Sequence, residues 1–450
     1  MRILDLTRLT LLGAAVYFFG GTGRAQSTGS TPDGSTPATA TEEDSGGLKD
    51  FLARTVKVTG QVRARWEGPE GSNFTATPSD SYLLTRTRVG LAFQPTSYLR
   101  FYGEAQDARA MNYKTNPAST VADPIDFRQG YAEIGAIEGP GAKLRVGRQD
   151  MTLGSGRLVS SGDWSNVTKP FDIFRGSVNT SFVKADIVGG SQVLIDPNRE
   201  DRDRPGERFY GAYTAFGKLI PHASIEPYFF AKTTLNVKGK DGKLGNADVL
   251  YGGARLIGTV PGGFDYNAEA VREGGDYADD VIQSLGYVAG GGWTLSRVSW
   301  KPHFNSDFAW ASGDDGQKDG HHQMFDYLYG SQQPLNSLTG LFCWRNIEDW
   351  RAGVDFTPTK KLKVKVDYRD YWLATLADGL YNSAGTKTVF DAKATSNHVG
   401  EGVDAMVIAT ITPKTIVGVG VGNLFPGSYL KQAGKTSGYV YPFVYFTRNL

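Results

Sequence analysis

The chain has 450 residues, a formal net charge of +1 and a hydrophobic content of 40%. This composition excludes a bundle of transmembrane helices, because after the first twenty residues no apolar run reaches the roughly 18 residues that a spanning helix needs. The nearly balanced charge gives no electrostatic reason to expect a nucleic-acid partner. The 57 glycines, the 20 prolines and an aromatic content of 12% instead indicate many short strands joined by turns.

The first residues have the pattern of a secretory signal. Arg2 and Arg8 precede an apolar run over residues 9–19, and small residues precede a cleavage point after Ala25. We therefore expect a signal peptide over residues 1–25 and an exported mature chain.

Residues 26–54 form a polar segment rich in Ser, Thr, Gly and Pro, with an acidic cluster at residues 42–44. Such a composition cannot bury a core, so we expect a disordered periplasmic lead-in. A plain linker is favoured over a binding tail.

From residue 55 onward the apolar residues alternate with polar ones. In residues 57–67, Val58, Val62 and Trp66 lie on one face of a strand while lysine and arginine lie on the other. The segments 83–93 and 99–106 repeat this pattern. A β-sandwich would alternate in the same way, so alternation alone does not place the strands in a membrane.

The spacing of the turns separates the two architectures. Tight turns are expected at Pro95, Pro140, Asn179, Pro221, Pro261, Ser296, Pro358 and Pro413. Longer polar loops are expected between them, at residues 68–81, 107–123, 150–169, 196–206, 236–245, 272–280, 312–346, 375–397 and 426–437. Tight turns that alternate with long loops are typical of an outer-membrane barrel, whose closure removes the unpaired edges of the sheet.

We therefore predict an all-β fold over residues 55–450, a transmembrane antiparallel barrel of about 18 strands. Its short turns and both chain termini are expected in the periplasm, and its long loops outside the cell. Residues expected in or near the aromatic girdles are Trp66, Tyr82, Tyr98, Tyr131, Tyr213, Tyr228, Trp293, Trp350 and Tyr441, and some of them are expected to face the lumen instead.

One long hairpin carries a recognisable motif. The run 145–149 reads RVGRQ, and it is followed by Gly154, by GRL at residues 156–158, by DWSN at residues 163–166 and by FD at residues 171–172. This run resembles the signature hairpin of the alginate export family of Gram-negative outer-membrane barrels. Weaker similarities lie at residues 106–109, at Phe325 and at residues 344–347. The resemblance implies a monomeric barrel of 18 strands and a basic conduit through which an anionic uronic-acid polymer leaves the periplasm.

The polar faces of the first strands supply the basic residues of such a conduit. Guanidinium binds carboxylate in a bidentate fork and stays charged at any pH. The expected lumen and cargo-binding residues are Lys57, Arg63, Arg65, Arg86, Arg88, Arg100, Lys143 and Arg145, with Glu104, Glu133 and Asp186 as structural partners. The alternative is that arginine and glutamate fill the lumen only to satisfy one another, as in many barrels.

Arg148 and Arg157 are further candidates for cargo binding. Arg148 lies in the apolar phase of its strand. Either a bulge shifts the register there, or the strand has already left the membrane. Where Arg148 points decides whether the hairpin is the filter or only its support.

Other motifs give weaker signals. Gly154 and Gly156 lack the third glycine and the helix of a nucleotide-binding loop. His321 and His322, near Asp314, Asp315 and Asp319, are more typical of a solvated loop than of a metal site, and these aspartates lack calcium-loop spacing. No metal, cofactor or enzymatic activity is expected. Cys343 is the single cysteine, so no internal disulfide can form.

Three functions remain open. The leading hypothesis is an outer-membrane channel for an anionic polysaccharide, such as an alginate-like polyuronate, or for a related acidic solute. The second is a porin for other small solutes without anion preference. The third is an outer-membrane hydrolase, for which only the His321 and His322 loop could supply a site. Expected partners are outer-membrane lipids, the acidic cargo and periplasmic assembly or export factors.

Overall fold

The computed structural model describes residues 47–450, apart from residues 78, 116, 218, 317, 332 and 334 and the side chain of Leu48. The expected signal peptide and most of the expected lead-in therefore lie outside the described residues. The prediction of a disordered lead-in is wrong for residues 47–54, because helix α1 spans Gly47–Thr55. Thr55 Oγ1 donates to the Phe51 carbonyl at 2.7 Å, and the Phe51 ring contacts that of Phe93 on the neighbouring strand.

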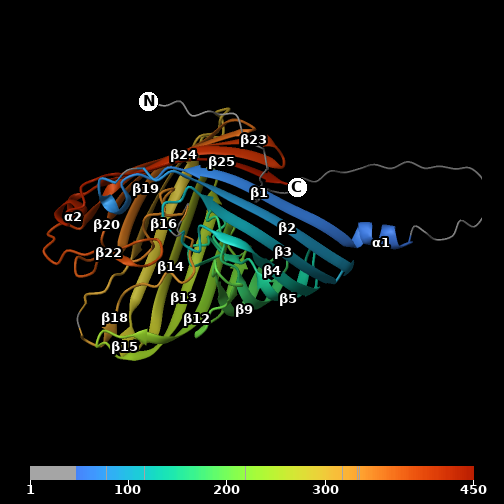
Figure 1. Cartoon of the computed structure of the whole chain (residues 1–450), viewed down its shortest axis with the longest axis horizontal. Helices are drawn as coiled ribbons and strands as arrows, with labels where there is room; N and C mark the ends of the chain where they lie inside the picture. Colours follow the sequence, from blue (N-terminus) through green and yellow to red (C-terminus); the bar gives the residue numbers. More distant parts are fainter. Residues whose placement is uncertain are drawn as a thin grey trace, which may run out of the picture.

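Eighteen antiparallel strands form the wall of a closed barrel (Figure 1). The wall strands are β1 (Val56–Glu67), β2 (Tyr82–Thr96), β3 (Leu99–Met111), β4 (Asp123–Gly135), β5 (Gly141–Gln149), β8 (Phe171–Asn179), β9 (Val183–Leu194), β11 (Glu207–Phe216), β12 (Ala223–Lys238), β13 (Leu244–Val260), β14 (Phe264–Tyr277), β16 (Ser284–Thr294), β17 (His303–Ala311), β19 (Ile347–Thr359), β20 (Leu362–Trp372), β23 (His398–Thr412), β24 (Thr415–Pro426) and β25 (Tyr439–Asn449). Pairing of β1 with β25, from Gln61 with Asn449 to Glu67 with Phe443, closes the barrel. The predicted fold class is confirmed.

The short and long connections lie at opposite ends of the barrel. Tight turns follow β2, β4, β8, β11, β13, β16, β19 and β23, each at or within two residues of a predicted position. Short elements occur in the long loops: η1 (Ser72–Phe74), β6 (Thr152–Leu153), β7 (Val159–Ser160), β10 (Arg202–Asp203), β15 (Asp280–Ile282), β18 (His321–His322), β21 (Leu380–Tyr381), β22 (Lys387–Val389) and α2 (Ser428–Gln432). The loop after β12 is shorter than predicted, because both flanking strands continue to residues 238 and 244.

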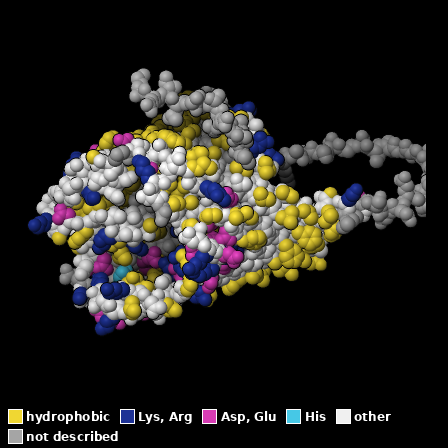
Figure 2. All heavy atoms as spheres, in the orientation of Figure 1, with side chains coloured by type: hydrophobic (Ala, Val, Ile, Leu, Met, Phe, Trp, Pro, Cys, Tyr) yellow, Lys and Arg dark blue, Asp and Glu magenta, His cyan; other side chains and the backbone are white. Residues whose placement is uncertain are grey.

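The outer wall carries a band of exposed apolar side chains, including Val58, Val89, Leu91, Ile187 and Phe229. Figure 2 shows hydrophobic side chains gathered over the end of the barrel next to α1, with charged side chains more frequent toward the long loops. Such a band is what a strand wall presents to lipid. No helix among the described residues is long and apolar enough to span a bilayer.

The predicted aromatic girdles are only partly present. Trp66, Tyr98, Trp293 and Trp350 are exposed on the outer wall. The other members of the set lie on the inner side, as expected for some of them: Tyr82, Tyr131, Tyr213, Tyr228 and Tyr441. The reason is strand alternation, which turns them toward buried acidic groups: Tyr82 Oη, for example, donates to Glu67 at 2.7 Å.

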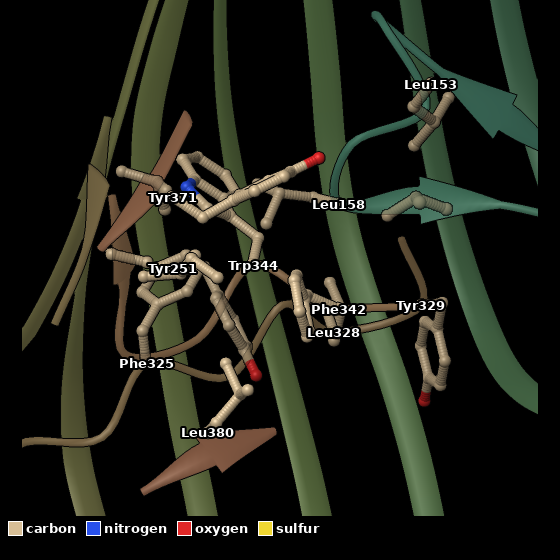
Figure 3. Close-up of a cluster of buried hydrophobic side chains, with 14 of the residues drawn as sticks. Leu153, Leu158, Tyr251, Phe325, Leu328, Tyr329, Phe342, Trp344, Tyr371 and Leu380 are labelled. Atoms are coloured by element: carbon tan, nitrogen blue, oxygen red, sulfur yellow. The ribbon is translucent and has the colours of Figure 1, made fainter. Parts of the chain in front are cut away.

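The hydrophobic core lies inside the barrel. The loops 150–170 and 312–346 bring Leu153, Leu158, Phe325 and Trp344 together with inward-facing aromatic residues of the wall. Figure 3 shows these side chains beside the inner face of the strands. The Phe325 and Trp344 rings lie 5.0 Å apart, and both side chains are buried. The two loops therefore form a packed plug within the lumen.

Candidate functional site

Four arginines of β1 and β2 form a compact basic patch on the inner wall. Arg63 lies directly opposite Arg86 in the strand register, and Arg65 and Arg88 lie on the same face. The Arg86 side chain is fully buried, with 0% of its surface exposed. Like charges directly opposite one another are unfavourable in a sheet, so this patch requires acceptors from elsewhere in the fold.

The tip of the 150–170 hairpin supplies these acceptors. Arg63 donates to the carbonyl oxygens of Asp163 at 3.1 Å and Ser165 at 2.8 Å. Arg86 also donates to the Ser165 carbonyl, at 3.0 Å, and Arg65 donates to the Trp164 carbonyl at 2.6 Å. We call this arrangement, Arg63, Arg65, Arg86 and Arg88 around residues 163–166, the arginine clamp.

The Asp163 carboxylate is the charged ligand of the clamp. Its oxygens lie 3.2 Å from Arg86 Nη2 and 3.0 Å from Arg88 Nη1. Burial alone would raise the pKa of this carboxyl group, but Arg86, Arg88 and Arg63 together hold the pKa well below its usual range. The patch therefore binds a carboxylate strongly enough to keep it ionised.

The neighbouring residues of the tip fix its position. The Trp164 ring packs edge-on against Phe443, at 5.2 Å between ring centres, and lies 4.9 Å from the Arg65 guanidinium carbon. Asn166 Nδ2 donates to the backbone carbonyls of Thr85 at 3.1 Å and Val121 at 2.9 Å. The side chains of Asp163, Trp164 and Asn166 thus each make contacts that dock the DWSN motif, and Ser165 contributes its backbone carbonyl.

Glycine allows the hairpin to cross the lumen. Gly154 has a φ of +56°, and a Cβ atom at this position would lie 2.4 Å from the Tyr213 hydroxyl on the opposite wall. Ser155 Oγ donates to Glu269 of β14 at 3.1 Å. The hairpin therefore reaches from β1 and β2 to β11 and β14.

A second group of basic residues surrounds Glu133. This carboxylate accepts from Arg100, from Lys143 at 3.0 Å and from Arg145 at 3.1 Å. The Arg145 guanidinium also lies over the Tyr131 ring, at 4.3 Å. Three cations thus share one acid, and this part of the wall keeps excess positive charge.

The other two predicted acidic partners are also engaged. Asp186 pairs with Arg175 at 2.8 Å. Glu104 pairs with Arg128, which sequence reasoning missed. The register of β3 with β4 shifts between Glu104 and Ala105, and this irregularity brings Arg128 to the inner side, where Arg128 also contacts Asp150. Strict alternation could not have found it.

A cavity of about 900 Å³ lies beside the clamp. It extends from Asp163 and Trp164 toward the short-turn end, where Lys57 and Asn449 line it. Its basic residues are Arg63, Arg65, Arg88, Arg100 and Arg128. The strands β23, β24 and β25, of which β25 pairs with β1, contribute Met406, Ile408, Ile416 and Tyr445. The cavity can hold a solute that combines anionic groups with an apolar face.

Two predicted cargo-binding residues lie elsewhere. Arg148 is on the same side of β5 as the exposed Leu144 and Val146, and its guanidinium is bound by Asp172 at 2.9 and 3.0 Å. The pairing of β5 with β4 and β8 has no bulge, so the strand has passed beyond the apolar band at this point. Placing Arg148 in the lumen was therefore wrong, and this residue supports the hairpin from its outer side.

Arg157 is in the lumen but inside the plug. Its guanidinium lies 5.1 Å from the centre of the Trp344 ring and donates to Asn336 at 3.2 Å. Burial lowers the pKa of this group. Arg157 therefore joins the two plug loops and does not face the cavity.

The histidine loop has a structural environment. The His322 ring lies flat against Tyr277, with ring centres 4.2 Å apart. Lys240 Nζ lies 2.8 Å from Asp314 and donates to the carbonyl of His321. The His322 ring is thus packed against the wall, whereas His321 is contacted through its backbone carbonyl.

Comparison with known proteins identifies the family. A family model described as Alginate export matches residues 54–441. Solved barrels of Pseudomonas aeruginosa share the fold: OccK5 (OpdH), with a TM-score of 0.59 and 10% identity, covers 88% of this chain and 98% of its own. OpdQ has a TM-score of 0.59 and 11% identity, covering 90% of this chain and 99% of its own. No curated protein matches the sequence significantly.

The match covers most of the chain, and it agrees with the closed barrel, the apolar outer band and the basic inner wall. The chain belongs to the alginate export family and is a porin-like outer-membrane channel.

Proposed function

We propose that this barrel passes an anionic polysaccharide of the polyuronate type, or a related acidic solute, through its arginine-lined lumen. The arginine clamp carries the proposal, because it already binds the carboxylate of Asp163 together with the carbonyl oxygens of the tip. A polyuronate presents the same groups, one carboxylate on each sugar unit with hydroxyl oxygens around it. The tip occupies the place that such a cargo would take.

The residues around Glu133 extend this path toward the short-turn end. Arg100, Lys143 and Arg145 retain partly exposed side chains and outnumber their shared acid. Lys57 lines the same cavity. A series of weak cationic sites suits a passive channel, since the cargo must leave each site as well as enter it.

The hairpin gives the channel a gate. A cargo carboxylate that reaches the clamp competes with Asp163 for Arg86 and Arg88, and it thereby favours release of the tip. In this scheme the clamp both closes the lumen and recognises the cargo.

A porin without anion preference is the second candidate. It is supported by the internal charge pairing, since Arg65 contacts Glu67 and Arg351 contacts both Asp307 and Asp367. In such a porin the charged side chains of the lumen pair with one another, and the channel discriminates little between anions and cations.

The proposed placement in the cell follows from the connections. The short turns and both ends of the barrel, at β1 and β25, would face the periplasm, and the long loops the exterior. We propose a monomer in contact with outer-membrane lipids, supplied by periplasmic assembly or export factors.

Reversal potentials in a planar bilayer distinguish the two candidates. The purified barrel should be anion-selective, and oligouronates should block its current in a concentration-dependent way. Replacing Arg100 and Arg145 together with Ser should reduce anion selectivity, whereas Arg208→Ser, at an exposed position outside the clamp, should not. Cation selectivity, or currents that oligouronates leave unchanged, would favour the second candidate.

A further inference from the structure

An uncompensated acidic group lies at the long-loop end of the barrel. Asp123 and Asp126 belong to β4, and Asp201 belongs to the loop between β9 and β11. One carboxylate oxygen from each of the three lies within 4.8 Å of the others. This grouping could not be predicted from the sequence, because Asp201 lies 75 positions beyond Asp126.

Asp123 is the most deeply buried member of the group. Only 3% of its surface is exposed. Its carboxylate makes no hydrogen bond or ion pair with any residue in the described part of the chain. Burying an ionised carboxylate without a partner is strongly unfavourable, so a buried carboxyl group is paired with a cation, bound to a metal ion or protonated. Because one of its oxygens lies close to carboxylate oxygens of Asp126 and Asp201, a cation that bound Asp123 would lie between the three groups.

Nearby basic residues do not supply this charge. The guanidinium of Arg148 is held by Asp172 through two hydrogen bonds, and it reaches only the backbone carbonyl of Asp201, at 3.0 Å. Arg109 pairs with Asp107 at 2.9 Å. Within the described residues, no lysine or arginine forms an ion pair with Asp123, Asp126 or Asp201.

The backbone already brings the two acidic segments together. The amide of Asp201 donates to Asp126 Oδ2 at 2.7 Å, and the amide of Asp196 donates to Asp201 Oδ1 at 2.9 Å. These contacts hold the carboxylates close despite their mutual repulsion. The loop crosses β5 and β8 to reach β4.

We propose that Asp123, Asp126 and Asp201 bind a divalent cation, with calcium preferred to magnesium. Calcium binds oxygen ligands at about 2.3–2.6 Å, so ligands on opposite sides of the ion lie up to about 5 Å apart. The three carboxylate oxygens, all within 4.8 Å of one another, are compatible with this span. Three carboxylates without nitrogen or sulfur suit a hard cation, and calcium tolerates the irregular geometry of such a set, with water completing its shell.

The bound ion would tie the loop after β9 to β4. Val193 and Ile195, just before this loop, pack against Val167 in the returning arm of the hairpin. The site thus lies beside the base of the gate, and calcium is expected to stiffen that base.

Equilibrium dialysis with radioactive calcium tests the site. The full-length mature barrel is refolded in detergent without lipopolysaccharide and is freed of metal with a chelator. We expect saturable binding of one calcium ion per barrel, at least tenfold weaker in Asp123→Asn and unchanged in Asp279→Asn, whose side chain is 70% exposed. Absence of saturable binding, or equal binding by Asp123→Asn, would overturn the site.

A loop variant covers the case in which Asp123→Asn does not fold. Asp201→Asn changes only a loop side chain and should weaken calcium binding in the same way. Calcium should also raise the unfolding temperature of the wild-type barrel more than an equal concentration of magnesium does. Equal effects of the two ions would overturn the calcium preference, and unchanged binding by Asp201→Asn would overturn the ligand assignment.

Discussion

Removing the charge of Asp163 should open the gate without unfolding the barrel. Asp163→Asn keeps the size of the side chain and the backbone carbonyls that Arg63 and Arg86 use, but it abolishes the ion pairs with Arg86 and Arg88. A hydrogen bond to a charged group is worth about 1.5–3 kcal/mol. Because the Asp163 side chain is 42% exposed, solvent screening reduces the expected loss to about 1–2 kcal/mol.

This loss corresponds to a roughly tenfold larger ratio of open to closed states, since about 1.4 kcal/mol changes an equilibrium constant tenfold. Single-channel recording in a planar bilayer measures the ratio directly from the dwell times. Asp279→Asn provides a matched control, because the same chemical change is made there at an exposed position outside the clamp. The heat-dependent gel mobility of both variants should stay that of a folded barrel. An open fraction equal to that of the wild type in a folded Asp163→Asn barrel would refute the clamp as the closing contact.

The same carboxylate predicts a pH dependence. The arginines lower the pKa of Asp163 in the folded protein relative to the unfolded chain, where an Asp titrates near 3.9. Its stabilising contribution is therefore fully present above about pH 4 and is lost as the pH falls through the folded-state pKa. Gating by this contact should not change between pH 7 and pH 5, and a transition within that interval in the wild type but not in Asp163→Asn would contradict the assignment.

Three further predictions concern the wall and the plug. Val89→Lys places a charge on the outer wall, where Val89 is 57% exposed, and should destabilise the inserted barrel by about 2–4 kcal/mol near the midplane in lipid refolding titrations. Gly330→Ala should separate the two plug loops, because its Cβ atom would lie 1.9 Å from the Arg157 carbonyl oxygen. Proteases should therefore cleave these loops faster in this variant. Gly274→Ala, whose Cβ atom would meet no atom within 4 Å, should not change the cleavage rate. Burial raises the pKa of the Cys343 thiol to about 12, so maleimide should label it slowly at pH 7, and rapid labelling of a closed channel would show that the plug is not packed.

The architecture could be predicted from the sequence because the signals that specify it are local in the sequence. Strand alternation and turn residues act over two to four positions, and closure of the sheet follows from the requirement that every backbone amide in lipid be paired. Pro95, Pro140 and Pro358 therefore lie in or within two residues of turns, and the strand count followed from such positions. Inner and outer faces could be assigned wherever the period was regular, as for Arg63 and Arg86.

Contacts between distant segments could not be predicted in the same way. The DWSN tip was identified as a motif, but its docking onto Arg63 and Arg86 joins residues about 80 to 100 positions apart. The register shift that turns Arg128 inward and the position of Arg148 beyond the apolar band both depend on neighbouring strands.

The sequence by itself thus determined the barrel, its family and the basic character of one wall, since these depend on periodicity and on a contiguous motif. Only the tertiary structure decided that the basic wall binds the protein's own hairpin. The physical reason is that buried guanidinium groups must find acceptors, and which segment supplies them depends on how the long loops fold into the lumen.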